Sequence, residues 1–230
     1  MNDSTHKKPD QERANLLQLL QGVNEFTHTA FPENRELFQS LANGQSPHTL
    51  FVTCADSRVV PERITQTRPG DLFVCRNIGN IVPGYGEMMG GVSAVVEYAV
   101  SALKVRQIVV CGHSDCGAMK GLMAQQAVAE TMPTVAAWLR NAEAARSVVF
   151  TRKPEGEAAL TALIEENVRL QLAHLRTHPS VAAALANGEL ALQGWVYNIE
   201  RGEVQVLSEN GRDFLTLDQA IEQQQAEAVA

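Results

Sequence analysis

Hydrophobic residues along the chain follow two different periods, and the change between them predicts the order of the elements. Residues 12–28 carry leucine, valine and phenylalanine at helical spacing, which predicts an amphipathic helix with a wide apolar stripe. A second short helix is expected after Pro32 and ends at Asn43-Gly44, since these two residues tolerate left-handed backbone. From residue 49 the pattern becomes the compact apolar run Leu50-Phe51-Val52-Thr53, which is typical of a strand buried on both faces.

The next segments alternate between strand and helix. Residues 72–75 and 108–111 are short apolar runs that predict strands, and residues 93–103 between them have the period of a helix. This alternation predicts a parallel sheet with right-handed crossovers. In such sheets, ligand sites collect beyond the carboxyl ends of the strands.

The second half of the chain adds helices and then two more strands. We expect helices over 117–129, 135–150 and 158–175, a short helix from Pro179, and two strands, 190–197 and 203–207, paired as a hairpin. The predicted class is therefore α/β: a mainly parallel central sheet flanked by helices, with an N-terminal helical arm and a C-terminal antiparallel edge strand. The expected boundaries are an arm over 1–46, a domain over 47–215, and a tail over 216–230 that frays or forms a terminal helix.

Composition excludes several classes of function. The net charge of −7 argues against nucleic-acid binding, and so does the absence of any basic patch in the sequence, since Lys and Arg are scattered among Asp and Glu. Residues 1–13 are polar, and no later apolar run reaches spanning length, so we expect neither a secretory signal nor a membrane anchor, and a cytoplasmic location. Four cysteines in a reducing compartment favour metal binding, catalysis or burial over disulfides.

Two of these cysteines and one histidine stand where strands are expected to end. Cys54 follows the first predicted strand, and His113-x-x-Cys116 follows the third, so the three side chains are expected to meet at one sheet edge. Two thiolates and an imidazole favour zinc, and three protein ligands are typical of catalytic sites that leave a position for water. The spacing alone leaves metal binding open, because short motifs of this kind arise by chance. The other two cysteines, Cys75 and Cys111, end apolar runs and are expected to be small buried hydrophobic residues.

A carboxylate and a guanidinium flank the first predicted ligand. Asp56 is the obvious fourth ligand, but Arg58 lies two residues further on and can hold the carboxylate in a bidentate pair. The residues therefore allow two states: Asp56 bound to zinc with no room for water, or Asp56 paired with Arg58 and facing a zinc-bound water.

At these residues the chain resembles a β-class carbonic anhydrase. Residues 54–58, Cys-Ala-Asp-Ser-Arg, match the family's C-x-D-S-R motif, and residues 112–117, Gly-His-Ser-Asp-Cys-Gly, match its G-H-S-x-C-G motif. Residues 70–74, 76–80 and 97–100 resemble intervening blocks of the same family. Ordered blocks of this kind are more specific than any single motif.

The resemblance implies one zinc per subunit, held by Cys54, His113 and Cys116, with Asp56 and Arg58 as the catalytic dyad. It implies reversible hydration of carbon dioxide to bicarbonate and a proton by a zinc-bound hydroxide. The family also implies an N-terminal helix that packs on a partner subunit, and hence a homodimer or a higher homo-oligomer.

The resemblance further assigns a substrate pocket and a site type. It places Gln45, Phe73, Ile78, Tyr98 and Gly117 in the substrate site. Family members that close by binding the aspartate to zinc usually have Trp and Gly where this chain has Phe51 and Thr53, so we expect the open, plant-like type. Two alternatives stay open: a related zinc hydrolase acting on carbon disulfide or carbonyl sulfide, and a non-catalytic zinc- or bicarbonate-binding protein.

Overall fold

The computed structural model describes residues 7–87, 90–152 and 154–227. The chain divides into two compact units, Met1–Gln45 and Ser46–Ala230.

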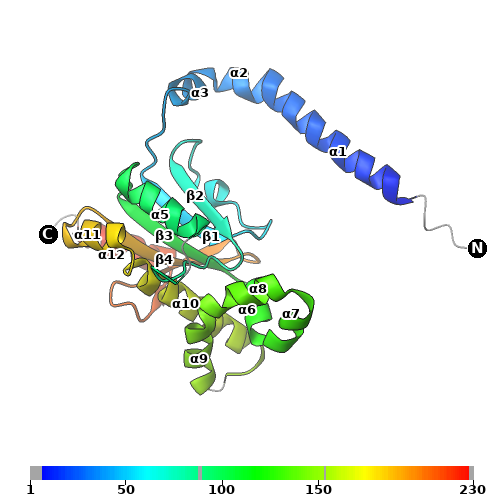
Figure 1. Cartoon of the computed structure of the whole chain (residues 1–230). Coiled ribbons are helices and arrows are strands. Elements are labelled where there is room, and N and C mark those ends of the chain that lie inside the picture. Colours follow the sequence, from blue (N-terminus) through cyan, green and yellow to red (C-terminus); the bar gives the residue numbers. More distant parts are fainter. Residues whose placement is uncertain (1–6, 88–89, 153, 228–230) are drawn as a thin grey trace, which may run out of the picture. The chain divides into compact units, whose positions relative to one another are not determined.

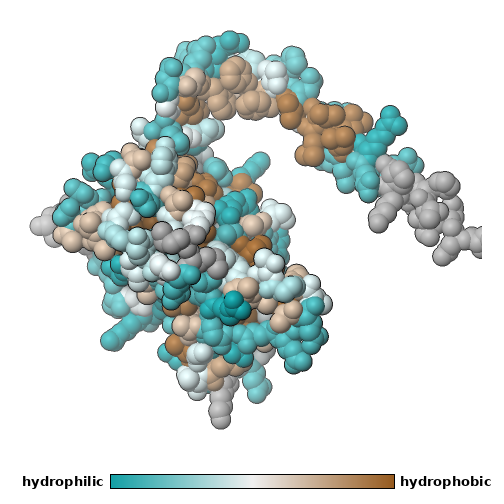
Figure 2. All heavy atoms as spheres, viewed as in Figure 1, coloured by the Kyte–Doolittle hydropathy of each residue, from teal (hydrophilic) through white to brown (hydrophobic). Residues whose placement is uncertain are grey.

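The first unit is helical. Helix α1 (Lys7–Glu25) runs through the π-helical turn η1 (Phe26–Ala30) into α2 (Phe31–Glu33), and α3 (Arg35–Leu41) follows. Three phenylalanine rings join these segments, with centroids 5.4–6.1 Å apart. The predicted apolar stripe is confirmed, and Figure 2 shows its brown side chains along α1. Its members are 45–69% exposed: Leu16, Leu17, Leu19, Leu20, Val23 and Phe26.

The second unit is built on a mixed six-stranded sheet in the order β2-β1-β3-β4-β5-β6. Figure 1 labels β1 to β4 of this sheet. Its strands are β1 (Thr49–Cys54), β2 (Leu72–Asn77), β3 (Gln107–His113), β4 (Ala191–Asn198), β5 (Glu203–Leu207) and β6 (Phe214–Leu215). The first four strands in this order are parallel, β5 pairs antiparallel with β4, and β6 pairs antiparallel with β5. The predicted α/β class and the C-terminal antiparallel strands are therefore confirmed.

Helices connect the strands and cover the sheet. They are α4 (Pro61–Thr65), α5 (Gly91–Ser101), α6 (Gly117–Met123), α7 (Gln125–Thr131), α8 (Pro133–Leu139), the 3-10 turn η2 (Arg140–Ala142), α9 (Glu143–Thr151), α10 (Gly156–Leu175), α11 (Pro179–Ala186) and α12 (Leu217–Glu227). The single helices predicted over 117–129 and 135–150 are wrong. The first is interrupted at Ala124 and the second by η2, and neither interruption contains a glycine or proline that would have indicated it. Of the two alternatives for the tail, a terminal helix is confirmed by α12.

The core lies on both faces of the sheet. Every residue of β1 is buried, as predicted. Because side chains alternate along a strand, Leu50 and Val52 join the larger apolar cluster, whereas Phe51 joins a smaller one with Val109 and Cys111.

Helix α10 packs against β3 and β4 on the side of the larger cluster. A Cβ atom at Gly112 or Gly194 would lie 3.0 or 2.9 Å from Val168 of α10, so glycine allows this close approach. Within residues 7–87, 90–152 and 154–227, no helix is both long enough and apolar enough to cross a membrane.

Candidate metal centre

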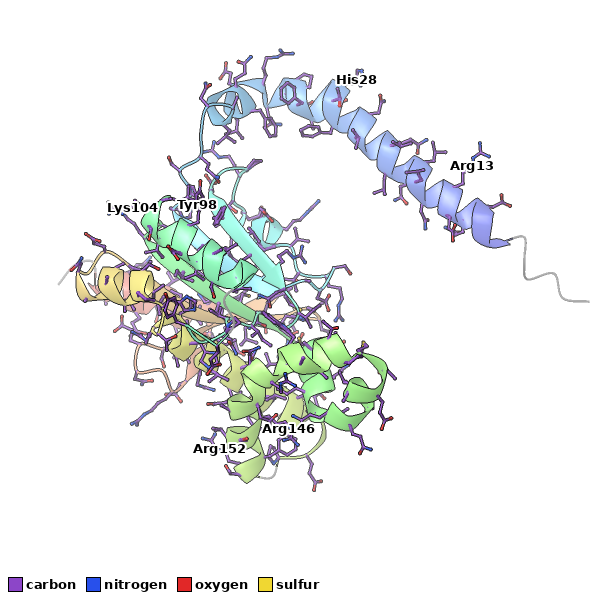
Figure 3. All side chains as sticks on the ribbon, viewed as in Figure 1. Arg13, His28, Tyr98, Lys104, Arg146 and Arg152 are labelled. Atoms are coloured by element: carbon purple, nitrogen blue, oxygen red, sulfur yellow. The ribbon has the colours of Figure 1, made fainter. Side chains whose placement is uncertain are left out.

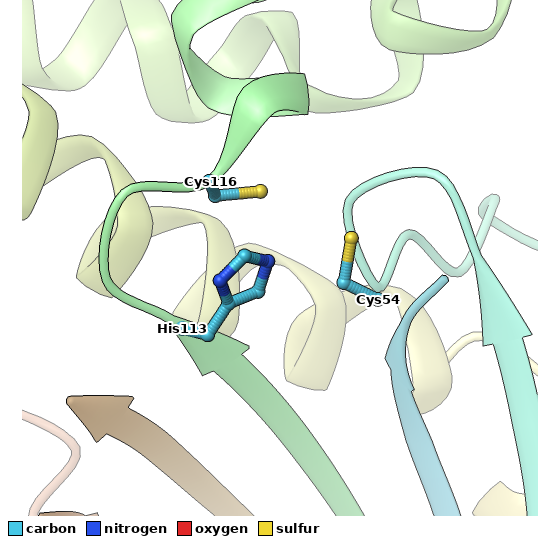
Figure 4. A group of neighbouring side chains, drawn as sticks. All are labelled: Cys54, His113 and Cys116. Carbon is cyan, nitrogen blue, oxygen red and sulfur yellow. The ribbon is translucent and has the colours of Figure 1, made fainter. Parts of the chain in front are cut away.

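Three predicted ligands converge at the carboxyl edge of the sheet. Cys54 is the last residue of β1, His113 is the last residue of β3, and Cys116 is the N-cap of α6. Since β1 and β3 are adjacent and parallel, their ends meet, and the three ligand atoms lie within 4.8 Å of one another (Figure 4). The expectation that the two motifs meet is confirmed.

His113 presents an unprotonated ring nitrogen that suits a metal ion. Its ring is fully buried, and Nδ1 lies 2.8 Å from the carbonyl oxygen of Ser114. A carbonyl only accepts, so Nδ1 carries the proton and Nε2 keeps its lone pair. Nε2 of His113 is buried without a hydrogen-bond partner among the residues that the structure describes. Such an orphaned nitrogen is costly, and a metal between it and two sulfur atoms would satisfy it. The residues therefore fit a zinc ion.

The two thiols are coupled. The pKa of Cys54 is lowered to about 4, first by a hydrogen bond from the Cys116 thiol and further by His113 and by the backbone amides of Gly79 and Asp56, against the effect of burial. The pKa of Cys116 is raised, first by its hydrogen bond to Cys54 and then by burial. Without a metal, the pair thus favours one thiolate and one thiol. A divalent cation would favour two thiolates, so metal binding releases a proton.

Asp56 and Arg58 form the bidentate pair that their spacing allows. Arg58 donates from Nη2 to Asp56 Oδ2 at 2.8 Å and from Nε to Asp56 Oδ1 at 2.9 Å, and its backbone amide adds a third bond to Oδ1 at 3.0 Å. These bonds, with the side-chain bond as the largest cause, hold the pKa of Asp56 well below its usual range. The carboxylate also lies beside the metal ligands, with Oδ2 3.9 Å from His113 Nε2.

Two further residues tie the metal loops together. Arg58 donates from Nη1 to Asp115 Oδ2 at 3.0 Å, and Lys120 donates to the other oxygen of Asp115. Arg76 donates to the carbonyl oxygens of Cys54 and Asp56 at 3.2 and 2.6 Å. Sequence reasoning missed both Asp115 and Arg76. Their position inside the matched motif blocks was the one available signal.

The predicted substrate residues do not all lie at the metal edge of the sheet. Ile78 directly follows Asn77, which pairs with Cys54 across the sheet, so Ile78 stands at the metal edge, 43% exposed. Gly117 adjoins Cys116 at the start of α6. Gln45 ends the first unit, and its part in the site stays a prediction.

The two predicted aromatic residues of the pocket lie away from this edge. Phe73 and Tyr98 contact each other, with ring centroids 6.0 Å apart, and Tyr98 is 51% exposed on α5 (Figure 3). In the parallel register Phe73 pairs with Leu50, four positions before Cys54, which is a separation of about 13 Å along the strand. Within one chain these rings therefore do not adjoin the metal ligands.

The two remaining cysteines are buried as predicted. Cys75 is 7% exposed and Cys111 is fully buried. Burial raises the pKa of both thiols, that of Cys111 to about 12. All four cysteines are free thiols.

Comparisons with known proteins agree with this geometry. Residues 49–204 match the family model described as carbonic anhydrase. A carbonic anhydrase of Pseudomonas aeruginosa is 54% identical over 200 residues, covering 86% of this chain and 90% of the relative.

Solved structures are similar as well. That of the β-carbonic anhydrase CcaA has a TM-score of 0.86 at 44% identity, covering 88% of this chain and 92% of that one. One of two tetrameric β-carbonic anhydrases of Sordaria macrospora has a TM-score of 0.75 at 29% identity, covering 85% and 98%. The sequence match over most of the chain and the shared fold lead to one conclusion: this chain belongs to the β-class carbonic anhydrases.

Proposed function

We propose that the chain catalyses the reversible hydration of carbon dioxide to bicarbonate and a proton, with zinc held by Cys54, His113 and Cys116. The observation that carries this proposal is the convergence of three ligand atoms within 4.8 Å at the edge where Asp56 and Arg58 also lie. When bound, the metal lowers the pKa of a water molecule and so supplies a nucleophile at neutral pH.

The dyad orients that nucleophile. Because its pKa is held low, Asp56 is ionised at neutral pH and can only accept hydrogen bonds. It therefore accepts a hydrogen bond from the attacking group, and this bond directs a lone pair of that group toward the substrate carbon. Arg58 fixes both carboxylate oxygens, so its role is to keep Asp56 charged and correctly aimed.

We propose the open type of site at neutral pH, with Asp56 off the metal. Three hydrogen bonds from Arg58 hold the carboxylate, and all would have to break or rearrange for Asp56 to become the fourth ligand. X-ray absorption at the zinc edge near neutral pH tests this assignment. Two sulfur, one nitrogen and one water oxygen are expected, and a carboxylate in place of the water would refute it.

The substrate pocket is proposed to include the partner subunit of a homodimer or higher homo-oligomer. The strand register puts Phe73 and Tyr98 far along the sheet from the metal ligands of the same chain, so these rings serve a site only when a second copy supplies them. The apolar stripe on α1 offers a surface for such an assembly. Gln45, Ile78 and Gly117 are proposed to complete the substrate site.

Stopped-flow hydration of carbon dioxide by zinc-loaded protein tests the activity. Inactivity at slightly alkaline pH with zinc bound would refute the proposal and favour a binding protein. Higher activity on carbon disulfide or carbonyl sulfide would instead favour the related hydrolase. Two variants separate the roles: Cys54→Ala is expected to lose zinc, whereas Asp56→Asn keeps zinc and slows turnover. Equal loss of zinc in both would contradict separate roles.

We also propose a cytoplasmic location. The four free thiols, two of them metal ligands, are consistent with a reducing compartment. Cell fractionation tests this, and recovery of the protein outside the cytoplasm would contradict it.

A further inference from the structure

A pair of amide side chains is buried in an otherwise apolar face of α10. Asn167 is 1% exposed and Gln171 is fully buried, whereas neighbouring buried positions of the helix include Leu163, Ile164 and Val168. Burying an amide is costly unless its hydrogen bonds are satisfied. The two side chains, one helical turn apart, bond to each other, since Gln171 Nε2 donates to Asn167 Oδ1 at 2.8 Å.

Their other bonds go to the loop after β2. Asn167 Nδ2 donates to the carbonyl oxygen of Gly79 at 3.0 Å, and the backbone amide of Val82 donates to Gln171 Oε1 at 2.9 Å. The preceding carbonyl, that of Ile78, accepts from Trp138 Nε1 at 2.7 Å. The backbone of residues 78–82 is therefore held from two helices.

Gly79 in turn adjoins both cysteine ligands. Asn77, two residues before it, pairs with the ligand Cys54 across the sheet. A Cβ atom at Gly79 would lie only 2.9 Å from the Cβ of Ala118, so the loop packs directly on the start of α6. Cys116 is the N-cap of this helix, two residues before Ala118.

We propose that Asn167 and Gln171 are positioning residues of the zinc centre, which hold Gly79 against the start of α6 and so fix where Cys116 stands relative to Cys54. Contacts outside the ligand shell that fix where a ligand stands tune the affinity of the site for its metal. Two buried helical side chains 89 and 88 residues along the chain from their loop partners thus set the ligand geometry. A plain tether between helix and loop would stabilise the fold but leave metal affinity unchanged.

Zinc binding itself distinguishes these roles. Asn167→Leu keeps the approximate volume, removes the donor to Gly79 and leaves Gln171 Nε2 without its acceptor. We expect its zinc affinity, measured by competition with a chromophoric chelator at neutral pH, to fall by about 10–100-fold, the usual effect of losing an outer-shell partner. In the cobalt-substituted protein, the thiolate-to-metal charge-transfer bands should shift. Gln171→Met keeps the bond between Asn167 and Gly79, so a smaller loss of affinity is expected.

Leu163→Ala provides the matched control. It removes buried volume from α10 one turn before Asn167, so it lowers stability while leaving the amide pair in place. Its zinc affinity and cobalt spectrum are expected to equal those of the wild type.

Two outcomes would overturn the proposal. The first is an Asn167→Leu protein that is destabilised like Leu163→Ala but binds zinc as the wild type does. The second is used if Asn167→Leu does not fold. In that case, a Gln171→Met protein with wild-type zinc affinity and a wild-type cobalt spectrum would overturn the proposal. Both readouts measure metal binding, so their result is independent of whether the enzyme hydrates carbon dioxide.

Discussion

Replacing Gly79 with alanine perturbs a tightly packed turn beside the metal centre. Gly79 has a φ of +81°, in the region that side-chain-bearing residues rarely adopt. An added Cβ would also meet Ala118 Cβ at 2.9 Å and Met119 Cε at 3.2 Å. The substitution therefore combines backbone strain with a steric clash.

The two costs can be separated. A left-handed backbone costs a non-glycine residue about 1–2 kcal/mol. Overpacking a close contact adds about 1–3 kcal/mol when the neighbours must shift. Gly79→Ala is therefore expected to lower the free energy of unfolding by about 2–5 kcal/mol, a large part of the roughly 5–15 kcal/mol that stabilises a typical protein.

Gly202→Ala supplies the control for backbone strain. Gly202 has a φ of +68°, but an added Cβ there would have nothing within 4 Å. It should thus lose only the strain term, about 1–2 kcal/mol. Any entropy that alanine removes from the unfolded chain is common to both variants and cancels in the comparison.

Urea unfolding of the metal-free proteins at one protein concentration measures both losses. Gly79→Ala should lose about 1–3 kcal/mol more than Gly202→Ala, the overpacking term alone. Equal losses would show that the loop gives way without cost, and would refute the close packing of Gly79 on α6.

Three further predictions concern charge, metal and thiol. Burial raises the pKa of Glu165, so its contribution to stability is full below the ordinary value of 4.5 and is lost as pH rises through the raised value. Glu165→Gln should consequently gain stability relative to the wild type between acidic and neutral pH in urea titrations of metal-free protein, and a constant difference would contradict this. Zinc at 100 times its dissociation constant should raise the free energy of unfolding by about 2.7 kcal/mol in thermal or urea melts. Cys116→Ser should lose most of that increment, and a full increment would exclude Cys116 as a ligand. Cys111, fully buried and with its pKa raised to about 12, should resist iodoacetamide until urea unfolds the protein, whereas mass-spectrometric labelling in the native state would disprove its burial.

The metal cluster could be predicted from the sequence because its position depends on where two strands end. The apolar runs ending near Cys54 and Cys111 were strong strand signals, and adjacent parallel strands present their carboxyl ends at one edge. The family resemblance then assigned the dyad, whose hydrogen bonds the structure contains.

The supporting contacts could not be predicted in the same way. Asn167 and Gln171 are two polar residues in a helical pattern, and the neighbouring sequence does not indicate that they face the loop after β2 rather than solvent. Asp115 occupies a motif position where the spacing carries no chemical constraint, so its bond to Arg58 depends on how the two loops fold. Strand β6 has two residues, too few to give a period.

The pairing of β1 with β3 also has a consequence for folding. Thr53 and Cys111, which bond across that pair, are 58 residues apart in the chain, and β2 and α5 lie between them. Closing so long a segment loses chain entropy before the stabilising contacts form. This step is therefore slow relative to local helix formation. A growing chain that has not yet made His113 carries only Cys54 of the three ligands and cannot hold the metal. Zinc uptake thus reports that the centre of the sheet has assembled, and acquisition of metal during synthesis would mark the moment at which β3 joins β1.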